Sequence, residues 1–380
     1  MKKMKFKSVS IVFFMMMSSL NAQEFQEPDV ESTEPEIILP VQKAPERNAP
    51  DFLKPQGITK YSPWHFAVSP FTTTRWGQQK EFVYSKNFDG DLVTLSQLDW
   101  DEKPIFFFGA QGDAGYKIVN GNFRAEIAVP GLFYPNTGKM YDSDWQNKPL
   151  LTSSDPLYGV KTDYSTHTNY VDFYYILSGG FSCDFDFNLE KFNISKITLS
   201  PSANLEYSYS SFFGKDGIGY YASAGLGESF GHPYTEWETY GQKVDFSGQE
   251  VIQLERIIYK TWLGLSASAE FNNGFSAGLS FAVCPYVSLQ SLDSHFTRDL
   301  FFLDTLSEYF NGLKFEVTAA KKFTKHHSLF IKAEYEYIAE FDGTTQQANG
   351  DKNGIYFLLS DTSGAAFEWF EFTLGYKFSF

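Results

Sequence analysis

The C-terminal segment of the chain has the pattern that most restricts its fold. From residue 372 to residue 380, every second residue is phenylalanine, tyrosine or leucine, and the residues between them are threonine, glycine, lysine and serine. A period of two places alternate side chains on opposite faces of a β-strand, so one face is apolar and the other is polar. Such a strand needs an apolar environment on one side and a wetter one on the other.

The same amphipathic pattern recurs along the chain, between segments that contain turn-forming residues. Ten strands are expected, at about residues 64–86, 91–119, 123–134, 168–186, 194–212, 251–271, 275–290, 313–323 and 328–340 and at the C-terminus. The sequence therefore predicts an all-β fold, a ten-stranded antiparallel transmembrane β-barrel with long extracellular loops.

Short and long connections between these strands are expected to alternate. Short turns are indicated at Asp89-Gly90, which has the signature of a type I′ hairpin, and at Asn120-Gly121, Asn188, Asn272-Asn273-Gly274 and Lys325-His326. An even number of strands leaves both ends of a barrel on the periplasmic side. The turns near residues 120, 188, 273 and 325 would then face the periplasm, and the long segments 137–166, 213–249, 291–311 and 342–364 would face outside.

The N-terminal residues are expected to lie outside the barrel. Four lysines between residues 2 and 7 precede an apolar run at residues 11–17, and Leu20-Asn21-Ala22 resembles a small-residue cleavage site, which predicts a signal peptide over residues 1–22. Residues 23–61 are rich in proline and glutamate and predict an acidic periplasmic linker. No run approaches the ~18 consecutive apolar residues that a transmembrane helix needs, so no membrane-spanning helix is expected. The barrel is expected to occupy residues 62–380.

Composition agrees with a barrel in a lipid bilayer. The chain contains 40 phenylalanines and 23 tyrosines, although its mean hydropathy is −0.29. Aromatic girdles and a polar lumen give transmembrane barrels this combination. The final strand, which ends on Phe380, resembles the assembly signal of bacterial outer-membrane barrels and implies the barrel-assembly machinery and outer-membrane lipid as partners. A soluble β-sandwich is the alternative that the signal peptide disfavours.

Charge and cysteine content exclude other classes of protein. The formal charge of −15 disfavours nucleic-acid binding and suits cationic partners. The two cysteines, Cys183 and Cys284, fall inside expected strands and are interpreted as unpaired packing residues. No Cys/His spacing typical of a metal site or a thiol catalyst occurs, so no metal is expected.

Two short patterns at the expected outer rim could carry chemistry. In Asp293-Ser294-His295, extended backbone places both functional side chains on one face, so the carboxylate can orient an imidazole that acts as a general base on water. In Asp142-Ser143-Asp144, two carboxylates lie side by side. At ~4 Å and an effective dielectric of ~20 they repel by ~4 kcal/mol, so they are expected to share a proton or hold a water or a cation. Alone, each pattern is also common in solvated surface loops.

In combination, these patterns resemble the omptin family of outer-membrane aspartate/histidine proteases, which are built on ten-stranded barrels. The resemblance covers about residues 75–380 and keeps the order and approximate spacing of the family's motifs. It rests on residues 80–84 (KEFVY), 96–100 (SQLDW), 142–145 (DSDW), 169–170 (NY), 293–295 (DSH) and 375–380 (GYKFSF).

The resemblance implies an endopeptidase that cleaves cationic peptides or proteins at basic residues, at the extracellular mouth of the barrel. By this resemblance, His295 is the base that activates water and Asp293 orients it. Asp142 and Asp144 are the opposing pair that positions the water and steadies the tetrahedral intermediate. Glu81 matches the acid at the base of the pocket for the residue before the cut.

The chain also departs from the family pattern. Ser291 stands where the archetype has a second pocket acid, so the substrate-binding pocket is expected to have lost a charge and to discriminate less for arginine. The family's basic cluster for lipopolysaccharide phosphates is poorly matched, because Ser208 near Glu206 stands where an arginine is expected and Arg256 is only approximately in register. These departures count against lipopolysaccharide as a lipid cofactor, and no other cofactor is expected. The linker before the barrel is not a usual family feature either.

Two alternatives to a protease remain open at this point. One is a non-enzymatic barrel that acts as an adhesin or ligand-binding surface protein, which the loss of charge at Ser291 and the missing arginine favour. The other is a diffusion porin, which is less expected because aqueous pores usually need about sixteen strands.

Overall fold

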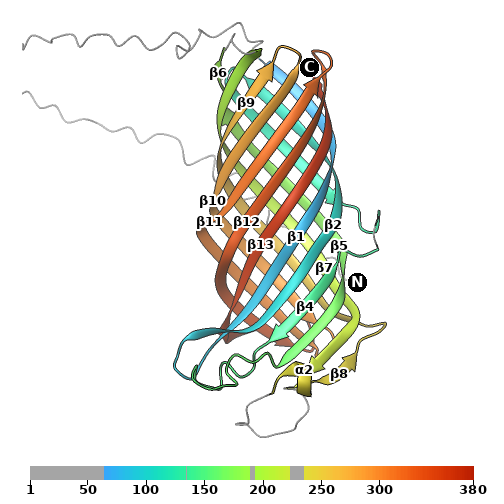
Figure 1. Cartoon of the computed structure of the whole chain (residues 1–380), viewed down its shortest axis with the longest axis vertical. Coiled ribbons are helices and arrows are strands. Elements are labelled where there is room, and N and C mark those ends of the chain that lie inside the picture. The colour runs from blue at the N-terminus through green and yellow to red at the C-terminus, as the bar shows by residue number, and fades with distance from the viewer. Residues whose placement is uncertain (1–63, 134, 189–192, 223–234) are drawn as a thin grey trace, which may run out of the picture. The chain divides into compact units, whose positions relative to one another are not determined.

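The computed structural model describes residues 64–133, 135–188, 193–222 and 235–380, without the side chains of residues 360 and 361. The expected signal peptide and linker lie outside the described residues. The described elements are β1 (Trp64–Lys86), β2 (Leu92–Tyr116), β3 (Val119–Ala128), β4 (Lys139–Asp144), β5 (Asp163–Cys183), β6 (Phe185–Phe187), β7 (Ile194–Tyr221), α2 (Trp237–Tyr240), β8 (Gln242–Asp245), β9 (Glu250–Phe271), β10 (Phe275–His295), β11 (Leu300–Lys322), β12 (His327–Asn349) and β13 (Phe357–Ser379) (Figure 1).

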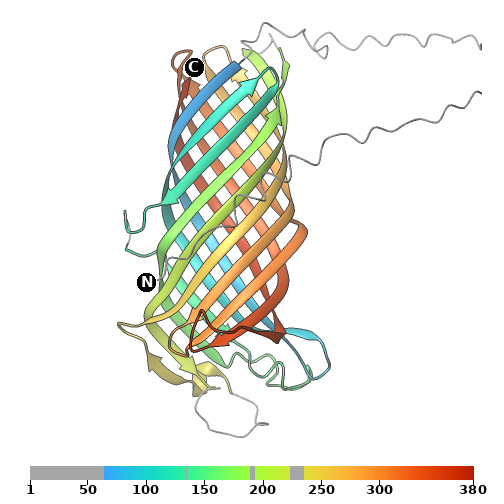
Figure 2. The same ribbon diagram turned by 180° about the vertical axis from the view of Figure 1, so that it is seen from behind.

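The long strands form one closed antiparallel sheet (Figures 1 and 2). The last strand pairs with the first, from Ala67 opposite Ser379 to Tyr84 opposite Thr362, and this pairing closes the ring. Every other neighbouring pair is also antiparallel, and β5 pairs with β7. The prediction of a ten-stranded antiparallel barrel is confirmed. Its ten wall strands include one that is divided into β3 and β4, which both pair with β2. Closure leaves no long unpaired strand edge in the wall.

In the last strand, the apolar residues of the alternating pattern face outward and the polar residues face the inside of the barrel. Phe370, Phe372 and Leu374 on β13 are exposed on the outside, whereas Glu371 and Thr373 are buried inside. The same division holds on the neighbouring strands, where Leu329, Ile331, Tyr335 and Tyr337 of β12 and Leu313, Phe315 and Val317 of β11 are exposed. This apolar belt surrounds the part of the barrel nearest the C-terminus and identifies the membrane-spanning segments. None of the described helices is long and apolar enough to cross a membrane.

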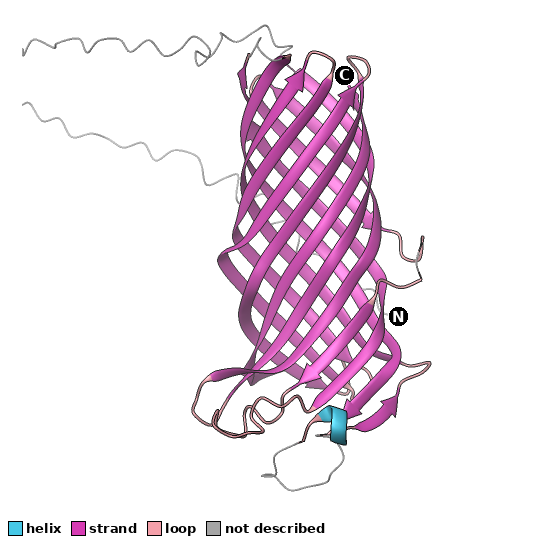
Figure 3. Ribbon diagram, viewed as in Figure 1, coloured by secondary structure: helices cyan, strands magenta, loops and turns pink. Residues whose placement is uncertain are grey.

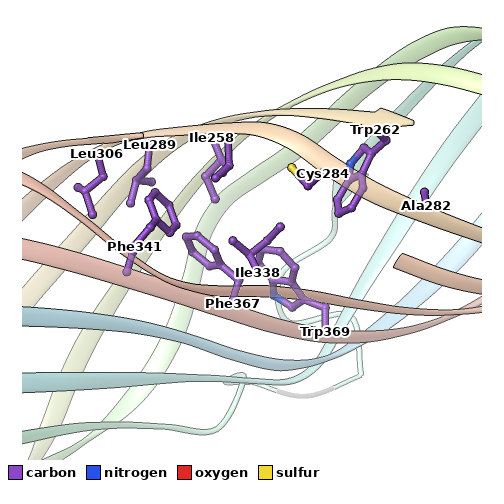
Figure 4. Close-up of a cluster of buried hydrophobic side chains, with 12 residues drawn as sticks. Ile258, Trp262, Ala282, Cys284, Leu289, Leu306, Ile338, Phe341, Phe367 and Trp369 are labelled. Carbon is purple, nitrogen blue, oxygen red and sulfur yellow. The ribbon is translucent and has the colours of Figure 1, made fainter. Parts of the chain in front are cut away.

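The lumen inside the belt is polar, and it closes farther along the barrel. At the level of the belt the inner wall carries ion pairs, such as Lys260 with Glu206 at 2.5 Å and Lys314 with Glu336 at 2.9 Å, around a cavity of about 510 Å³. Beyond it, buried apolar side chains from β9 to β13 meet inside the barrel, with Trp262 and Trp369 among them (Figure 4). A second buried cluster lines the β2, β4 and β7 side of the wall.

The short turns only partly follow the expectation. Gly274 has a positive φ of 76° in the turn between β9 and β10, as its sequence signal predicts. The turn between β2 and β3 is instead formed by Lys117 and Ile118, and Asn120-Gly121 lies inside β3, because Lys117 itself adopts the left-handed conformation with φ 55°. The type I′ prediction for Asp89-Gly90 is wrong: Gly90 has a positive φ and Asp89 does not, and the Asn87 side chain accepts two backbone N–H bonds across the turn.

The strands extend farther than predicted at the end away from the C-terminus (Figure 3). The segment expected to be a loop at 291–311 contains only four residues between β10 and β11, and β12 and β13 occupy much of the segment 342–364. Polar residues can continue a sheet in water when both neighbouring strands continue beside them, because the backbone hydrogen bonds are still satisfied. The strands predicted from apolar alternation were therefore too short, and their predicted ends lie near the end of the apolar belt.

The third expected strand is interrupted. The strand predicted at 123–134 ends at Ala128, and the same wall strand of the barrel continues as β4 from Lys139. Pro130 and Pro135 lie in the segment between β3 and β4, and proline cannot donate a ladder hydrogen bond. The consequence for the candidate site is direct: Asp142 and Asp144 lie in a strand that pairs with β2 and β5, not in a loop.

Candidate active site

Asp293 and His295 are at the end of β10, at the opposite end of the barrel from the C-terminus (Figure 1). Their register partners on β9, Leu254 and Ile252, are fully buried, and both Asp293 and His295 share that inner face. The hydrogen bond expected from the Asp-x-His spacing is present, with 2.5 Å between His295 Nε2 and Asp293 Oδ2. Phe302 on β11 packs edge-on against the imidazole, with 5.5 Å between ring centroids.

The second imidazole nitrogen is occupied by Arg298. This residue lies in the four-residue connection between β10 and β11, and its Nη2 donates a hydrogen bond to His295 Nδ1. Because a guanidinium can only donate, Nδ1 must be the acceptor, and Nε2 must carry the proton that is donated to Asp293. The neutral tautomer of His295 is thereby defined. Nδ1 is the nitrogen with basic character, and in this conformation Arg298 covers it.

The acid pair lies on β4, across the barrel from the dyad. Asp142 and Asp144 share the face of Met140, which is buried in the cluster on the inner wall. Pairing with β2 places Asp142 opposite the buried Leu98, and Ser96 Oγ donates a hydrogen bond of 3.5 Å to Asp142 Oδ1. Both carboxylates therefore point inward, although part of their surface stays open to solvent.

The two clusters meet at one end of the barrel. In the strand order, β4 and β10 are separated by several strands in either direction round the ring, so the side chains face each other across the mouth. The charge of Asp293 contributes to the shifted pKa of Asp142, which places the two carboxylates within electrostatic range. The positive charge of Arg298 acts on Asp142, Asp144 and Asp293 together, and opposes the shift of each.

Burial shifts the pKa values of the dyad and of the acid pair, which lie beyond the apolar belt. It raises the pKa of Asp142 to about 6 and that of Asp293 to about 7. It also raises the pKa of Asp144 well above the ordinary value, with the neighbouring Asp142 adding to the shift. Burial, reinforced by the charge of Arg298, lowers the pKa of His295 well below its ordinary value, so its imidazole is neutral at pH 7. A neutral histidine is the form that can accept a proton.

Glu81 and Ser291 lie beneath the dyad, and both are in contact with Arg256. Arg256 Nη2 lies 3.1 Å from Glu81 Oε2, Nη1 donates to Gln79 Oε1 at 3.1 Å, and Nε donates to Ser291 Oγ at 3.4 Å. Arg256 is 1% exposed and Glu81 is 3% exposed. Glu81, the acid expected to bind the substrate side chain before the cut, is therefore already paired with Arg256 within the chain.

Three residues of the site were not predicted to belong to it. The sequence interpretation assigned no role to Arg298 or Asp304, and it placed Arg256 near a surface lipid site. Strand parity could have corrected the last assignment, because Arg256 has the same parity as the apolar residues Leu254 and Ile258 and so shares their inner face. Glu206 and Ser208, which the sequence interpretation also compared with that lipid site, point into the barrel as well.

Comparison with known proteins agrees with this fold. The model of the Omptin family matches residues 63–380. Among solved structures, the outer membrane protease OmpT from Escherichia coli matches with a TM-score of 0.65 and 18% identity, over 85% of this chain and 99% of that chain. The outer membrane protein OprG from Pseudomonas aeruginosa matches with a TM-score of only 0.33 and 9% identity, over 83% and 95%. None of the curated protein sequences compared with the chain matches it.

The closed sheet, the apolar belt and the polar lumen define an outer-membrane β-barrel protein. Within that class, the family match over nearly all of the barrel is specific, and the chain belongs to the omptin family, the family of outer-membrane proteases that its motifs resemble.

Proposed function

We propose that this protein is an outer-membrane endopeptidase that hydrolyses exposed peptides or proteins with water activated by Asp293 and His295. The observation that carries the proposal is the convergence of the hydrogen-bonded dyad on β10 and the acid pair on β4 at one mouth of the barrel. This mouth is opposite the chain end that the barrel places on the periplasmic side, so the reaction takes place outside the cell.

The proposed reaction needs no metal, no covalent acyl-enzyme and no lipid cofactor. A water molecule held between Asp142, Asp144 and His295 attacks the peptide carbonyl carbon, and His295 Nδ1 takes the proton that this water loses. The imidazolium, oriented by Asp293, then donates that proton to the departing amine as the carbon–nitrogen bond breaks. Arg298 must leave Nδ1 before the first step, because a nitrogen that already accepts a hydrogen bond cannot take the water proton.

The proposal includes a preference for basic residues at the cut. Asp142, Asp144 and Asp293 concentrate negative charge at the mouth, and such a field attracts cationic peptides. Two internal cations, Arg256 and Arg298, partly neutralise this field. Electrostatic attraction of cationic peptides to the mouth therefore does not identify which acid binds the basic side chain. The partners proposed on these grounds are cationic peptides or proteins, in a barrel that is surrounded by outer-membrane lipid and inserted by the barrel-assembly machinery.

Cleavage of a mixed peptide pool by refolded wild-type protein, mapped by mass spectrometry, tests the proposal. We expect cuts next to basic residues that persist in EDTA and after serine-directed reagents. His295→Ala and Asp142→Asn should lower the rate by at least about a hundredfold, because each removes a group that acts on the attacking water. His326→Ala, in an exposed turn near the C-terminal end of the barrel, is the matched control and should retain the wild-type rate. Wild-type protein that folds but cuts no peptide would refute the proposal.

A second candidate function is a non-enzymatic surface receptor on the same scaffold. It is favoured by the hydrogen bond from Arg298 to His295 Nδ1, since this conformation withholds the base. Binding of a host matrix protein that survives both Asp142→Asn and His295→Ala would support this alternative. A diffusion porin is disfavoured by the apolar side chains that meet inside the barrel between the lumenal cavity and the mouth (Figure 4).

A further inference from the structure

The carboxylate of Glu81 is not free to bind a substrate cation. Its partner Arg256, on β9, is held by two other strands, through Glu81 and Gln79 of β1 and Ser291 of β10. A guanidinium from a substrate would have to displace a buried arginine that already has several hydrogen-bond acceptors, which is costly because the displaced charge would be left unpaired.

A different carboxylate lies close by with an unused acceptor. Asp304 on β11 is 3% exposed, and among the described residues its Oδ1 has no hydrogen-bond partner. It shares the inner face of β11 with Phe302 and Leu306. A buried carboxylate oxygen without a hydrogen-bond donor is unfavourable, and a donor from a bound ligand would satisfy it.

The position of Asp304 connects it to the dyad. It is the register partner of Ser291, which lies two residues before Asp293 on the same face of β10. Two residues along a strand span about 6.5–7 Å, so Asp304 is about one side-chain layer below the reacting groups. Phe302, which lies two residues before Asp304 on β11, packs against His295. The side chain of a residue next to the cut would reach about this depth.

We propose that Asp304 is the specificity-determining carboxylate of this protein and binds the guanidinium or ammonium group of a basic residue next to the cut. It supplies from β11 the negative charge that Ser291 lacks on β10, whereas Glu81 serves to hold Arg256. This inference rests on the proposed endopeptidase activity.

Two further observations agree with this role. Burial raises the pKa of Asp304 to about 6, with Asp293 adding to the shift and the hydroxyl of Thr345 opposing it. The carboxylate is therefore mostly ionised at pH 7, as binding of a cation requires. Glu81, in contrast, has a pKa raised well above its ordinary value by burial, and the charge of Arg256 only partly offsets this.

The test compares two peptides that differ only in arginine or citrulline at the residue before the cut, because citrulline keeps the shape of arginine and lacks its charge. The ratio of their kcat/KM values is measured for wild type, Asp304→Asn and Glu81→Gln. We expect wild type to favour arginine by at least about tenfold. Asp304→Asn should bring the ratio within about threefold of one, while Glu81→Gln should stay within about threefold of wild type.

The two variants are matched, since each replaces one buried carboxylate by an amide of the same shape. The inference is overturned if Glu81→Gln abolishes the arginine preference and Asp304→Asn keeps it, or if wild type cuts both peptides equally. Arg75→Gln, which removes a buried arginine from its pair with Glu371 in the lumen, controls for loss of a buried charge elsewhere. Its peptide ratio should equal that of wild type.

Binding of the same two peptides separates this inference from the proposed function. If wild type cuts neither peptide, the proposed function fails, and affinities are then measured on folded His295→Ala protein. Tighter binding of the arginine peptide that is lost in Asp304→Asn/His295→Ala still supports a cation site at Asp304. Equal affinity for the two peptides refutes it. Heat-modifiable mobility on gels verifies that each variant has folded.

Discussion

At the scale of single residues, Arg298 is the side chain that most directly opposes activity in this conformation. Its guanidinium covers the basic nitrogen of His295 and partly neutralises three surrounding carboxylates. We expect Arg298→Gln to raise kcat by about tenfold or more at pH 8, because a hydrogen bond to a charged group is worth about 1.5–3 kcal/mol and each ~1.4 kcal/mol is a factor of ten in rate. Single-turnover cleavage measures this change. A lower rate at pH 8 would instead make Arg298 a positioning residue for the dyad.

The pH dependence of cleavage follows from the two carboxylates whose pKa values are raised. Asp142 and Asp293 must be ionised, and their pKa values of about 6 and about 7 lie above the ordinary value. Protonation therefore removes activity as the pH falls through 7 and then 6, while His295 stays neutral because its pKa is lowered. We expect kcat/KM to have an acid limb in this window, with the two apparent values belonging to the coupled cluster.

Loss of Arg298 should move this acid limb. The positive charge of Arg298 opposes the raised pKa values of both carboxylates, so Arg298→Gln should shift the limb to higher pH. The control is Arg75→Gln, whose charge lies in the lumen near the belt. An acid limb that remains in place in Arg298→Gln would show that other groups control the titration.

At the scale of strands, the sequence was most informative where one face meets lipid. The alternation in β12 and β13 predicted both strands and the direction of their faces, because lipid and lumen impose opposite polarity on successive residues. Beyond the belt this contrast disappears, and the extension of β10 to His295 and the start of β11 at Leu300 were not predicted. Those extensions depend on hydrogen bonds with neighbouring strands, which a single sequence does not display.

The candidate site shows the same division between local and long-range information. The hydrogen bond between Asp293 and His295 is local, and the two-residue spacing was enough to predict it. The pairs of Arg256 with Glu81 and of Asp304 with Ser291 join residues far apart in sequence, and only strand register brings them together. The sequence therefore suggested which residues form the candidate dyad, whereas the register partners that we propose to set specificity could be identified only from the fold.

At the scale of the whole barrel, a cluster of buried apolar side chains lies between the lumenal cavity and the mouth. The ion pairs near the belt line a polar cavity, but the apolar cluster containing Trp262 and Trp369 separates it from the acid cluster (Figure 4). Arg75 and Lys260 lie over the ring of Trp369, at 4.9 and 4.7 Å from its centroid, so the indole is held from the lumenal side as well. Exclusion of bulk water from the lumenal side would favour the proposed reaction, which uses a single held water.

Removal of both indoles should open a path through the barrel. We expect wild-type protein in planar lipid bilayers to conduct no steady ion current, and Trp262→Ala/Trp369→Ala to give measurable conductance, because two large buried side chains leave the apolar cluster together. Each substitution should also lower stability by about 3–5 kcal/mol. Trp76→Ala, on the exposed outer face of β1, is the matched control and should remain closed. Steady conductance of the wild type, or a closed double variant that is correctly folded, would show that the seal lies elsewhere in the lumen.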